Sequence, residues 1–308
     1  MTEGDLARAT APAGVPGAAG WRRRSAAALA ATAMFAWLLA PVTAGADGRP
    51  AGSGGLAQIE GAGGGGLTAW ALIAGSGTDR ELGGDAYYTS ILLKDYALQS
   101  YGAALGIEDR LEISLARQRF SVDHTSPTVA IRQTIAGAKL RLVGDAVVDQ
   151  DRWWPQVSAG VLWKHNEDYA AIPRALGAPH ASSLEPYLAA TKLYLAGPLG
   201  RTWLADATLR FSEANQLGLL GFGGERGGRH LLAEGSLVAF VSDSVAAGIE
   251  YRQKRGDLAA LREDDSYDVV ATWLPARHWS VTAAYVQLGS IANRPGQRGG
   301  YASVQWVW

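Results

Sequence analysis

The chain has 308 residues, of which 28 are Lys or Arg and 29 are Asp or Glu, so its formal net charge is −1. This balance leaves no basic excess for binding nucleic acid. The chain has no cysteine, which excludes a disulfide framework and a thiolate metal site.

The first 46 residues have the pattern of a secretory signal peptide with a long leading region. A basic cluster at residues 21–24 precedes an apolar run at residues 25–40, and Ala44-Gly45-Ala46 fits the small-x-small pattern of a cleavage site. A membrane anchor is the alternative, but the apolar run is short for a helix that spans a bilayer, which needs about 20 residues. We therefore predict cleavage after Ala46 and export of the mature chain.

Residues 47–84 form a Gly-rich segment that includes four consecutive glycines at residues 63–66. A phosphate-binding loop would need Lys followed by Ser or Thr after the glycines, and neither is present. Residues 67–74 are typical of a short apolar strand. The segment is predicted to be a plug in a barrel lumen or an extra strand.

Residues 85–308 read as a series of segments of about ten residues separated by turn signals, which is the length of membrane strands. Polar and apolar residues alternate along them, as in strands with one face toward lipid. The twelve segments are residues 85–93, 96–106, 111–120, 130–143, 156–165, 186–196, 202–212, 230–242, 245–254, 266–274, 279–289 and 300–308. The prediction is an all-β fold, a transmembrane antiparallel up-and-down β-barrel of about 12 strands. The alternative has 14 strands, if residues 67–74 pair with a further Gly-rich strand.

The last segment, residues 300–308, ends the chain on an amphipathic strand with Trp306 and Trp308. A terminal aromatic residue resembles the assembly signal of bacterial outer-membrane barrels, and implies the barrel-assembly machinery as a partner. Reading back from a periplasmic C-terminus, long outer loops alternate with short inner turns; residues 144–155 break this rule. A soluble β-sandwich, the alternative, has no reason to alternate in this way. The predicted location is the bacterial outer membrane.

Charged residues are predicted on the lumen face of the barrel. They suggest a constriction that binds a small polar or anionic solute, or ion pairs that fill a narrow barrel. The predicted lumen residues are Lys139, Arg141, Lys164, Lys192, Arg210, Glu234, Glu250, Arg252 and Asp268.

Arg117, Arg119 and Arg132 are predicted on the outward face near the outer end of one hairpin. Arginine is costly in hydrocarbon, so these side chains are expected at the lipid headgroups, where lipopolysaccharide phosphates would bind them. A bulge that turns them inward is an open alternative.

Signals for catalysis and metal binding are weak. The acidic cluster at residues 263–265 and Asp268 lacks the ligand spacing of a calcium loop, and the five histidines show no metal spacing. Ser182 and Ser183 lie near His180 without a nucleophile-elbow motif or an evident orienting acid. We predict no enzyme activity, no metal and no cofactor.

Five stretches of the chain carry a resemblance to a known family, and they are residues 60–67, 150–153, 174–178, 214–224 and 262–265. At these stretches the chain is similar to a bacterial family, the Domain of Unknown Function 3034 family. The resemblance implies a Gram-negative envelope protein, and supplies no activity and no catalytic residues. Residues 215–224 are expected to fold back into the barrel mouth and narrow it, so that deleting residues 219–224 would raise conductance.

The predicted function is a narrow channel or facilitator for small polar solutes with a mixed-charge lumen. The alternatives are a non-conducting structural, lipid-binding or adhesive outer-membrane barrel and, third, a membrane-embedded hydrolase. Outer-membrane lipids and lipopolysaccharide are the expected lipid partners.

Overall fold

The computed structural model describes residues 52, 54–121 and 129–308. The predicted signal peptide, residues 1–46, lies outside the described residues. The twelve long strands are β3 (Leu82–Leu93), β4 (Ala97–Ile107), β5 (Leu111–Ser121), β6 (Ala130–Val143), β7 (Gln156–Asn166), β8 (Ser182–Tyr194), β9 (Trp203–Ser212), β10 (His230–Ser242), β11 (Val245–Arg252), β12 (Ser266–Ala276), β13 (Trp279–Gln287) and β14 (Arg298–Val307). The short elements are strands β1 (Leu56–Ala57) and β2 (Gly63–Gly64) and the 3₁₀ turns η1 (Pro198–Gly200) and η2 (Asn215–Gly218).

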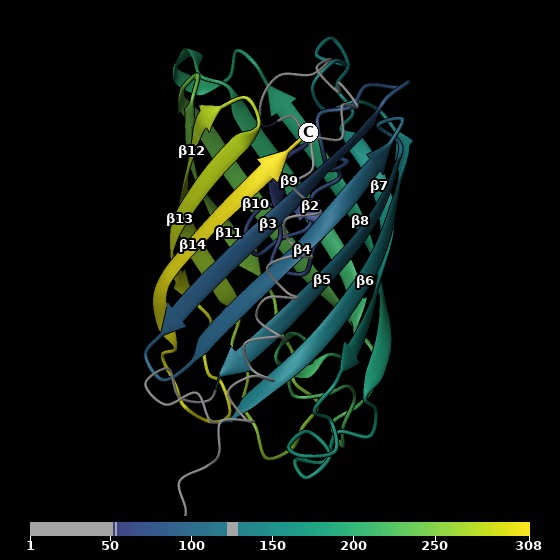
Figure 1. The fold of residues 1–308 in the computed structure, drawn as a ribbon, viewed down its shortest axis with the longest axis vertical. Coiled ribbons are helices and arrows are strands. Elements are labelled where there is room, and N and C mark those ends of the chain that lie inside the picture. The colour runs from purple at the N-terminus through teal and green to yellow at the C-terminus, as the bar shows by residue number, and fades with distance from the viewer. Residues whose placement is uncertain (1–51, 53, 122–128) are drawn as a thin grey trace, which may run out of the picture. The chain divides into compact units, whose positions relative to one another are not determined.

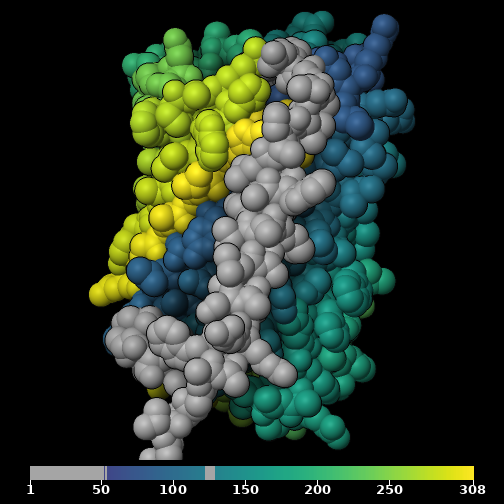
Figure 2. Space-filling model, in the orientation of Figure 1, coloured from purple at the N-terminus to yellow at the C-terminus, as the bar shows by residue number. Residues whose placement is uncertain are grey.

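The twelve long strands form one closed antiparallel barrel in which each strand pairs with its neighbours in sequence. The barrel closes where β14 pairs with β3, in a register that sets Tyr301 opposite Ile91. Figure 2 shows this seam, with the yellow last strand directly beside the blue first strand. The predicted twelve-strand all-β barrel is therefore confirmed, and the fourteen-strand alternative is wrong because β1 and β2 form a separate two-stranded sheet that is not part of the barrel.

The barrel wall has the polarity of a membrane protein. Large apolar side chains such as Leu115, Ile249 and Val269 are more than half exposed on the outward face. Inward positions between them on the same strands are buried and largely polar. A closed sheet with an apolar outside satisfies every requirement for crossing hydrocarbon as strands. Among the described residues, no helix is long and apolar enough to span a bilayer.

Aromatic side chains gather at both ends of the outward face. Tyr251 pairs in register with Tyr267 at one end, and Trp279 with Trp306 at the other. The end with Trp306 carries the C-terminus and is called the inner end below; the opposite end is the outer end. Such aromatic pairs suit the headgroup level on each side of a bilayer.

Residues 54–78, called the plug segment below, lie inside the barrel (Figure 1), where the short β1–β2 ladder forms. The apolar strand expected at residues 67–74 is not formed; the only ladder contact there is a bridge between Gly64 and Ala69. The reason is that barrel-wall side chains, rather than a neighbouring strand, bind the backbone of this stretch, as the next subsection describes.

Candidate functional site in the barrel lumen

The centre of the lumen holds a cluster of six buried charged side chains, called the ion cluster below. Three are acidic and three basic, so the cluster is neutral. Five come from barrel strands and one, Glu60, comes from the plug segment. The members are Glu60, Lys164, Glu185, Arg210, Glu234 and Arg252.

Glu60 connects the plug segment to all three cations of the cluster. Its carboxylate pairs with Lys164, with Arg252 at 3.0 Å and with Arg210 at 3.3 Å. Burial alone would raise the pKa of Glu60, but the charges of Arg252, Lys164 and Arg210 hold it well below the ordinary value of 4.5. Its carboxylate is therefore ionised at neutral pH, and its binding weakens only in acid, as the pH falls through that lowered pKa.

The other cluster members pair across the wall. Glu185 lies 2.8 Å from Lys164, and Glu234 lies 2.6 Å from Arg210 and 3.2 Å from Arg252. Buried charges are tolerated only when they are paired and hydrogen-bonded, and removing one partner of such a pair typically costs about 3–5 kcal/mol. The neutrality of the cluster thus depends on the plug segment being in place.

A second buried pair binds the plug segment at two points. The Lys139 ammonium lies 2.9 Å from Glu112 and donates to the carbonyls of Gly63 (2.9 Å) and Leu72 (2.6 Å). The Glu112 carboxylate accepts the amides of Gly63 (3.1 Å) and Ala74 (2.9 Å). Wall side chains thus replace the strand partners that the segment lacks.

Hydroxyl and carboxylate side chains bind further backbone groups of the segment. Ser100 donates to the Ile59 carbonyl at 2.6 Å, and Ser158 donates to that of Ala71 at 2.6 Å. The Glu250 carboxylate accepts the Leu67 amide at 2.8 Å. Side chains from several wall strands thus hold the segment inside the lumen.

Two glycines show why the segment is Gly-rich. A Cβ atom at Gly65 would overlap the Glu250 carboxylate, and one at Gly61 would lie 2.9 Å from the Ala116 side chain. Gly61 also has a φ of 96°, in the left-handed region that side chains disfavour. The backbone approaches the wall too closely for side chains.

Residues 215–224, called the outer cap below, fold into the outer mouth. The buried Asn215 side chain donates to the Gly223 carbonyl (2.8 Å) and accepts the Asp257 amide (2.8 Å). Leu219 joins Ile59 and Leu67 of the plug segment in one apolar cluster. The outer cap therefore lies in the outer mouth and packs against the plug segment.

One contact of the outer cap predicts a pH dependence. Burial raises the pKa of Glu263, which accepts the Gln216 amide at 2.9 Å, from 4.5 to about 7. Between these values the folded cap holds more protons than the unfolded chain, so its stability is fully present below pH 4.5 and is lost as the pH rises through about 7. Burial also lowers the pKa of Lys254 to about 8. This shift increases the stability of the cap as the pH rises, but only above about pH 8.

We expect proteolysis of the outer cap in the intact barrel to accelerate between about pH 5 and pH 7, by at most about tenfold per pH unit. Each cleavage rate is divided by the rate for the unfolded chain at the same pH, which removes the pH dependence of the protease itself. Glu263→Gln should abolish the dependence, whereas Glu225→Gln, at an exposed position just after the outer cap, should keep it. A pH-dependent rate in Glu263→Gln would assign the effect to another group.

Most of the residues that the sequence places in the lumen lie in the ion cluster or against the plug segment. Lys164, Arg210, Glu234 and Arg252 belong to the ion cluster, and Lys139 and Glu250 bind the plug segment. Asp268 is buried opposite Glu250 in the register of β11 and β12. Arg141 lies apart at the inner end, where it pairs with Asp109 (2.7 Å) and Asp145 (3.0 Å).

Lys192 is a correction to the predicted lumen set. Its neighbours Thr191 and Leu193 face the lumen, since Thr191 binds the Ala71 amide and Leu193 lines the lumen cavity described below. Lys192 therefore points outward. It is buried because the inner loop covers it, and it donates to the carbonyls of Asp149 (2.7 Å) and Arg152 (2.8 Å) in that loop. The long loop at residues 144–155 gives this strand end a polar cover.

Arg117, Arg119 and Arg132 lie on the outward face and are exposed, without an inward-turning bulge. Arg117 pairs with Glu167 and Arg132 with Asp168, each at 2.6 Å, and both guanidinium groups remain about half exposed. This leaves them able to contact a further anion.

The sequence reasoning missed Glu60, Glu112 and Glu185. Glu112 occupies an inward position of a predicted strand, so the alternation could have found it. Glu60 is the only charged residue between residues 54 and 78, which is the one signal that marks it. Among the described residues, no group of three His, Cys, Asp or Glu side chains is arranged to hold a metal ion.

Comparison with known protein families gives one match over most of the chain. A family model described as "Protein of unknown function (DUF3034)" matches residues 53–305. A search of curated proteins gave no match.

Three solved structures illustrate the similarity. The outer membrane protein Omp33 of Acinetobacter baumannii is 8% identical with a TM-score of 0.46, covering 75% of this chain and 100% of that one. The COG4313 outer membrane channel from Pseudomonas putida F1 is 13% identical with a TM-score of 0.34, covering 73% and 94%. Outer membrane phospholipase A from Escherichia coli is 8% identical with a TM-score of 0.37, covering 73% and 91%.

Proposed function

The chain belongs to the DUF3034 family, and we propose that this outer-membrane β-barrel is closed to ions and polar solutes at rest and serves a structural or binding role. One observation carries the proposal: Glu60 of the plug segment completes a neutral, fully buried ion cluster across the lumen. An open aqueous channel would leave these charges solvated and the lumen wall exposed.

The outer cap supports the same proposal. It fills the outer mouth above the plug segment, so a solute would meet two barriers in series. A barrel of twelve strands is narrow enough for side chains and one internal segment to fill it.

Planar-bilayer recording tests the proposal. The purified barrel should insert and give no resolvable current steps in salt solution, with insertion shown by its heat-dependent mobility on a denaturing gel. Stable steps in the unmodified protein would overturn the closed state and favour the second candidate.

The second candidate is a narrow facilitator for small polar solutes that opens when the plug segment leaves. It is favoured by the chemistry of the uncovered wall, where Lys139, Lys164, Arg210 and Arg252 pair with Glu112, Glu185 and Glu234. Water can solvate such a wall, whereas it cannot solvate an apolar one. The two candidates differ in whether the plug segment leaves the unmodified barrel, and its departure would appear as current steps.

We propose no enzyme activity. The nearest approach to a catalytic pair is Ser182 Oγ, 2.7 Å from His165 Nδ1 at the outer rim. Among the described residues, no acidic or amide side chain is hydrogen-bonded to the other ring nitrogen of His165, so the orienting group of a catalytic triad is missing.

We also propose that Arg117, Arg119 and Arg132 contact lipopolysaccharide phosphates, which their exposure at the outer end supports. The last strand, β14, is proposed to engage the barrel-assembly machinery, because its pairing with β3 closes the barrel.

A further inference from the structure

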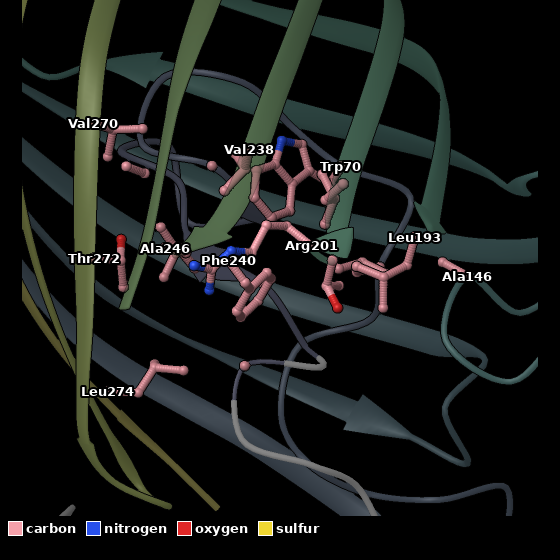
Figure 3. Close-up of a pocket in the computed structure, with 18 of the residues that line it drawn as sticks. Trp70, Ala146, Leu193, Arg201, Val238, Phe240, Ala246, Val270, Thr272 and Leu274 are labelled. Carbon is pink, nitrogen blue, oxygen red and sulfur yellow. The ribbon is translucent and has the colours of Figure 1, made fainter. Parts of the chain in front are cut away.

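The inner end of the lumen contains an apolar cavity of about 410 Å³ between the plug segment and the wall strands β8 to β12. In Figure 3, the side chains of Trp70, Leu193, Val238 and Phe240 gather around this space. Its position is distinct from the ion cluster, although Glu250 borders both regions.

The lining departs from the polarity of the rest of the lumen. Leu204, Val238, Ala246 and Val270 occupy inward strand positions and are buried, where the same strands carry charged or hydroxyl side chains farther along. Trp70 of the plug segment packs in the same apolar cluster. The inner end of the lumen thus has an apolar lining, whereas the same strands carry charged and hydroxyl side chains nearer the ion cluster.

An unfilled apolar space is a cost to the fold, because its lining lacks van der Waals partners. Two alanines, Ala146 and Ala246, border the cavity where larger side chains would fill it. An apolar cavity of about 150 Å³ holds one benzene molecule, or about 25 Å³ for each non-hydrogen atom. By this measure a cavity of 410 Å³ holds about 16 non-hydrogen atoms. This lies within the usual range for small-molecule sites, about 300–1,000 Å³.

The charges at the border indicate the polarity of the occupant. Arg201 lines the cavity, is exposed, and donates one hydrogen bond to the Val241 carbonyl at 2.7 Å. Within the described part of the chain, no carboxylate lies within ion-pair distance of Arg201. The border also holds two acids: Asp243 is exposed, and Glu250 is occupied by Leu67, Thr68 and Ser236.

We propose that this cavity binds a small amphipathic anion. The apolar body of the ligand lies against Trp70 and Val238, and its anionic group lies at Arg201. The ligand enters from the inner end, where residues 195–202 and 242–244 border the cavity. The site does not require the barrel to conduct or to be closed, since the plug segment separates it from the outer mouth.

The test uses 2-naphthalenesulfonate, an amphipathic anion close to the expected size, and its neutral counterpart 2-naphthol. Binding is measured by equilibrium dialysis against the full barrel held in amphipathic polymer, which avoids detergent micelles. We expect saturable binding of the sulfonate with a Kd on the order of micromolar. A strictly linear, unsaturable uptake by the unmodified barrel would overturn the proposal.

Two tryptophan substitutions locate the binding. Ala246→Trp fills the cavity from an inward position and should weaken binding at least about tenfold. Ala271→Trp, an outward position one strand away at nearly the same height, should bind as the unmodified barrel does. Ala146→Phe fills the cavity from a loop, in case Ala246→Trp does not assemble. If a folded Ala246→Trp or Ala146→Phe barrel binds the sulfonate as tightly as the unmodified barrel, the cavity is not the binding site.

Arg201→Gln tests the anionic group. It should weaken binding of the sulfonate by about tenfold, the usual effect of losing a charge-assisted hydrogen bond, and leave 2-naphthol unchanged. An equal loss for both probes would overturn the role assigned to Arg201.

Discussion

Replacing Glu60 by lysine should expel the plug segment from an otherwise intact barrel. The change places a fourth positive charge among Lys164, Arg210 and Arg252, and leaves only Glu185 and Glu234 as counter-charges. Breaking one buried pair typically costs about 3–5 kcal/mol, and this variant converts three attractions into repulsions. The strands themselves keep their backbone ladders.

Labelling of a single cysteine measures the release cleanly, because the chain has no cysteine of its own. Ser100 donates to the Ile59 carbonyl and is fully buried, so Ser100→Cys should react with a water-soluble maleimide only when the segment has left. A loss of about 3 kcal/mol corresponds to a labelling rate at least about a hundredfold higher in the Glu60→Lys background.

Two controls separate charge from damage. Glu225→Lys makes the same charge change at an exposed loop position and should leave the labelling slow. Arg210→Glu combined with Glu60→Lys restores neutrality in the ion cluster and should slow the labelling again. Slow labelling in a folded Glu60→Lys barrel would mean that the remaining hydrogen bonds, such as those of Lys139, Glu112 and Glu250, retain the segment.

Current through the barrel should require removal of both barriers. Deleting residues 219–224 opens the outer cap, but the plug segment still fills the lumen beneath it, so this deletion alone should leave bilayers silent. The same deletion in the Glu60→Lys background should give discrete current steps. This revises the expectation from the sequence, in which the cap deletion alone raises conductance.

The control for this experiment is deletion of residues 225–228, which shortens the same loop at exposed positions and leaves the outer cap in place. In the Glu60→Lys background it should not produce the steps that deletion of residues 219–224 gives. Steps from the cap deletion in the unmodified background would show that the plug segment is not a barrier to ions.

The strands could be predicted from sequence because burial on one face enforces a period of two. Along β9, for example, Leu204, Asp206, Thr208 and Arg210 face inward while Ala205, Ala207 and Leu209 face outward. This alternation located all twelve strands of the barrel to within a few residues. The family resemblance was likewise confirmed over residues 53–305.

The contents of the lumen could not be predicted in the same way. The plug segment has no period, because its backbone binds wall side chains from many strands rather than one partner. The apolar cavity was missed because Leu204 and Val238 face inward with the same polarity as lipid-facing residues, which removes the contrast between faces. Lys192 was misassigned because a loop, and not the lumen, buries it.

The plug segment enters and leaves the barrel at the same end. Gly52 borders the inner cavity beside Leu274, and the Ser76 amide donates to the Trp308 carbonyl at 3.2 Å, just before β3 begins. The segment is therefore a hairpin whose tip, near Ile59 and Leu67, points toward the outer end. A mechanical pull on the chain ahead of Gly52 would withdraw this hairpin without threading a chain end or parting any barrel strand, so extraction and unfolding are separate events in this molecule.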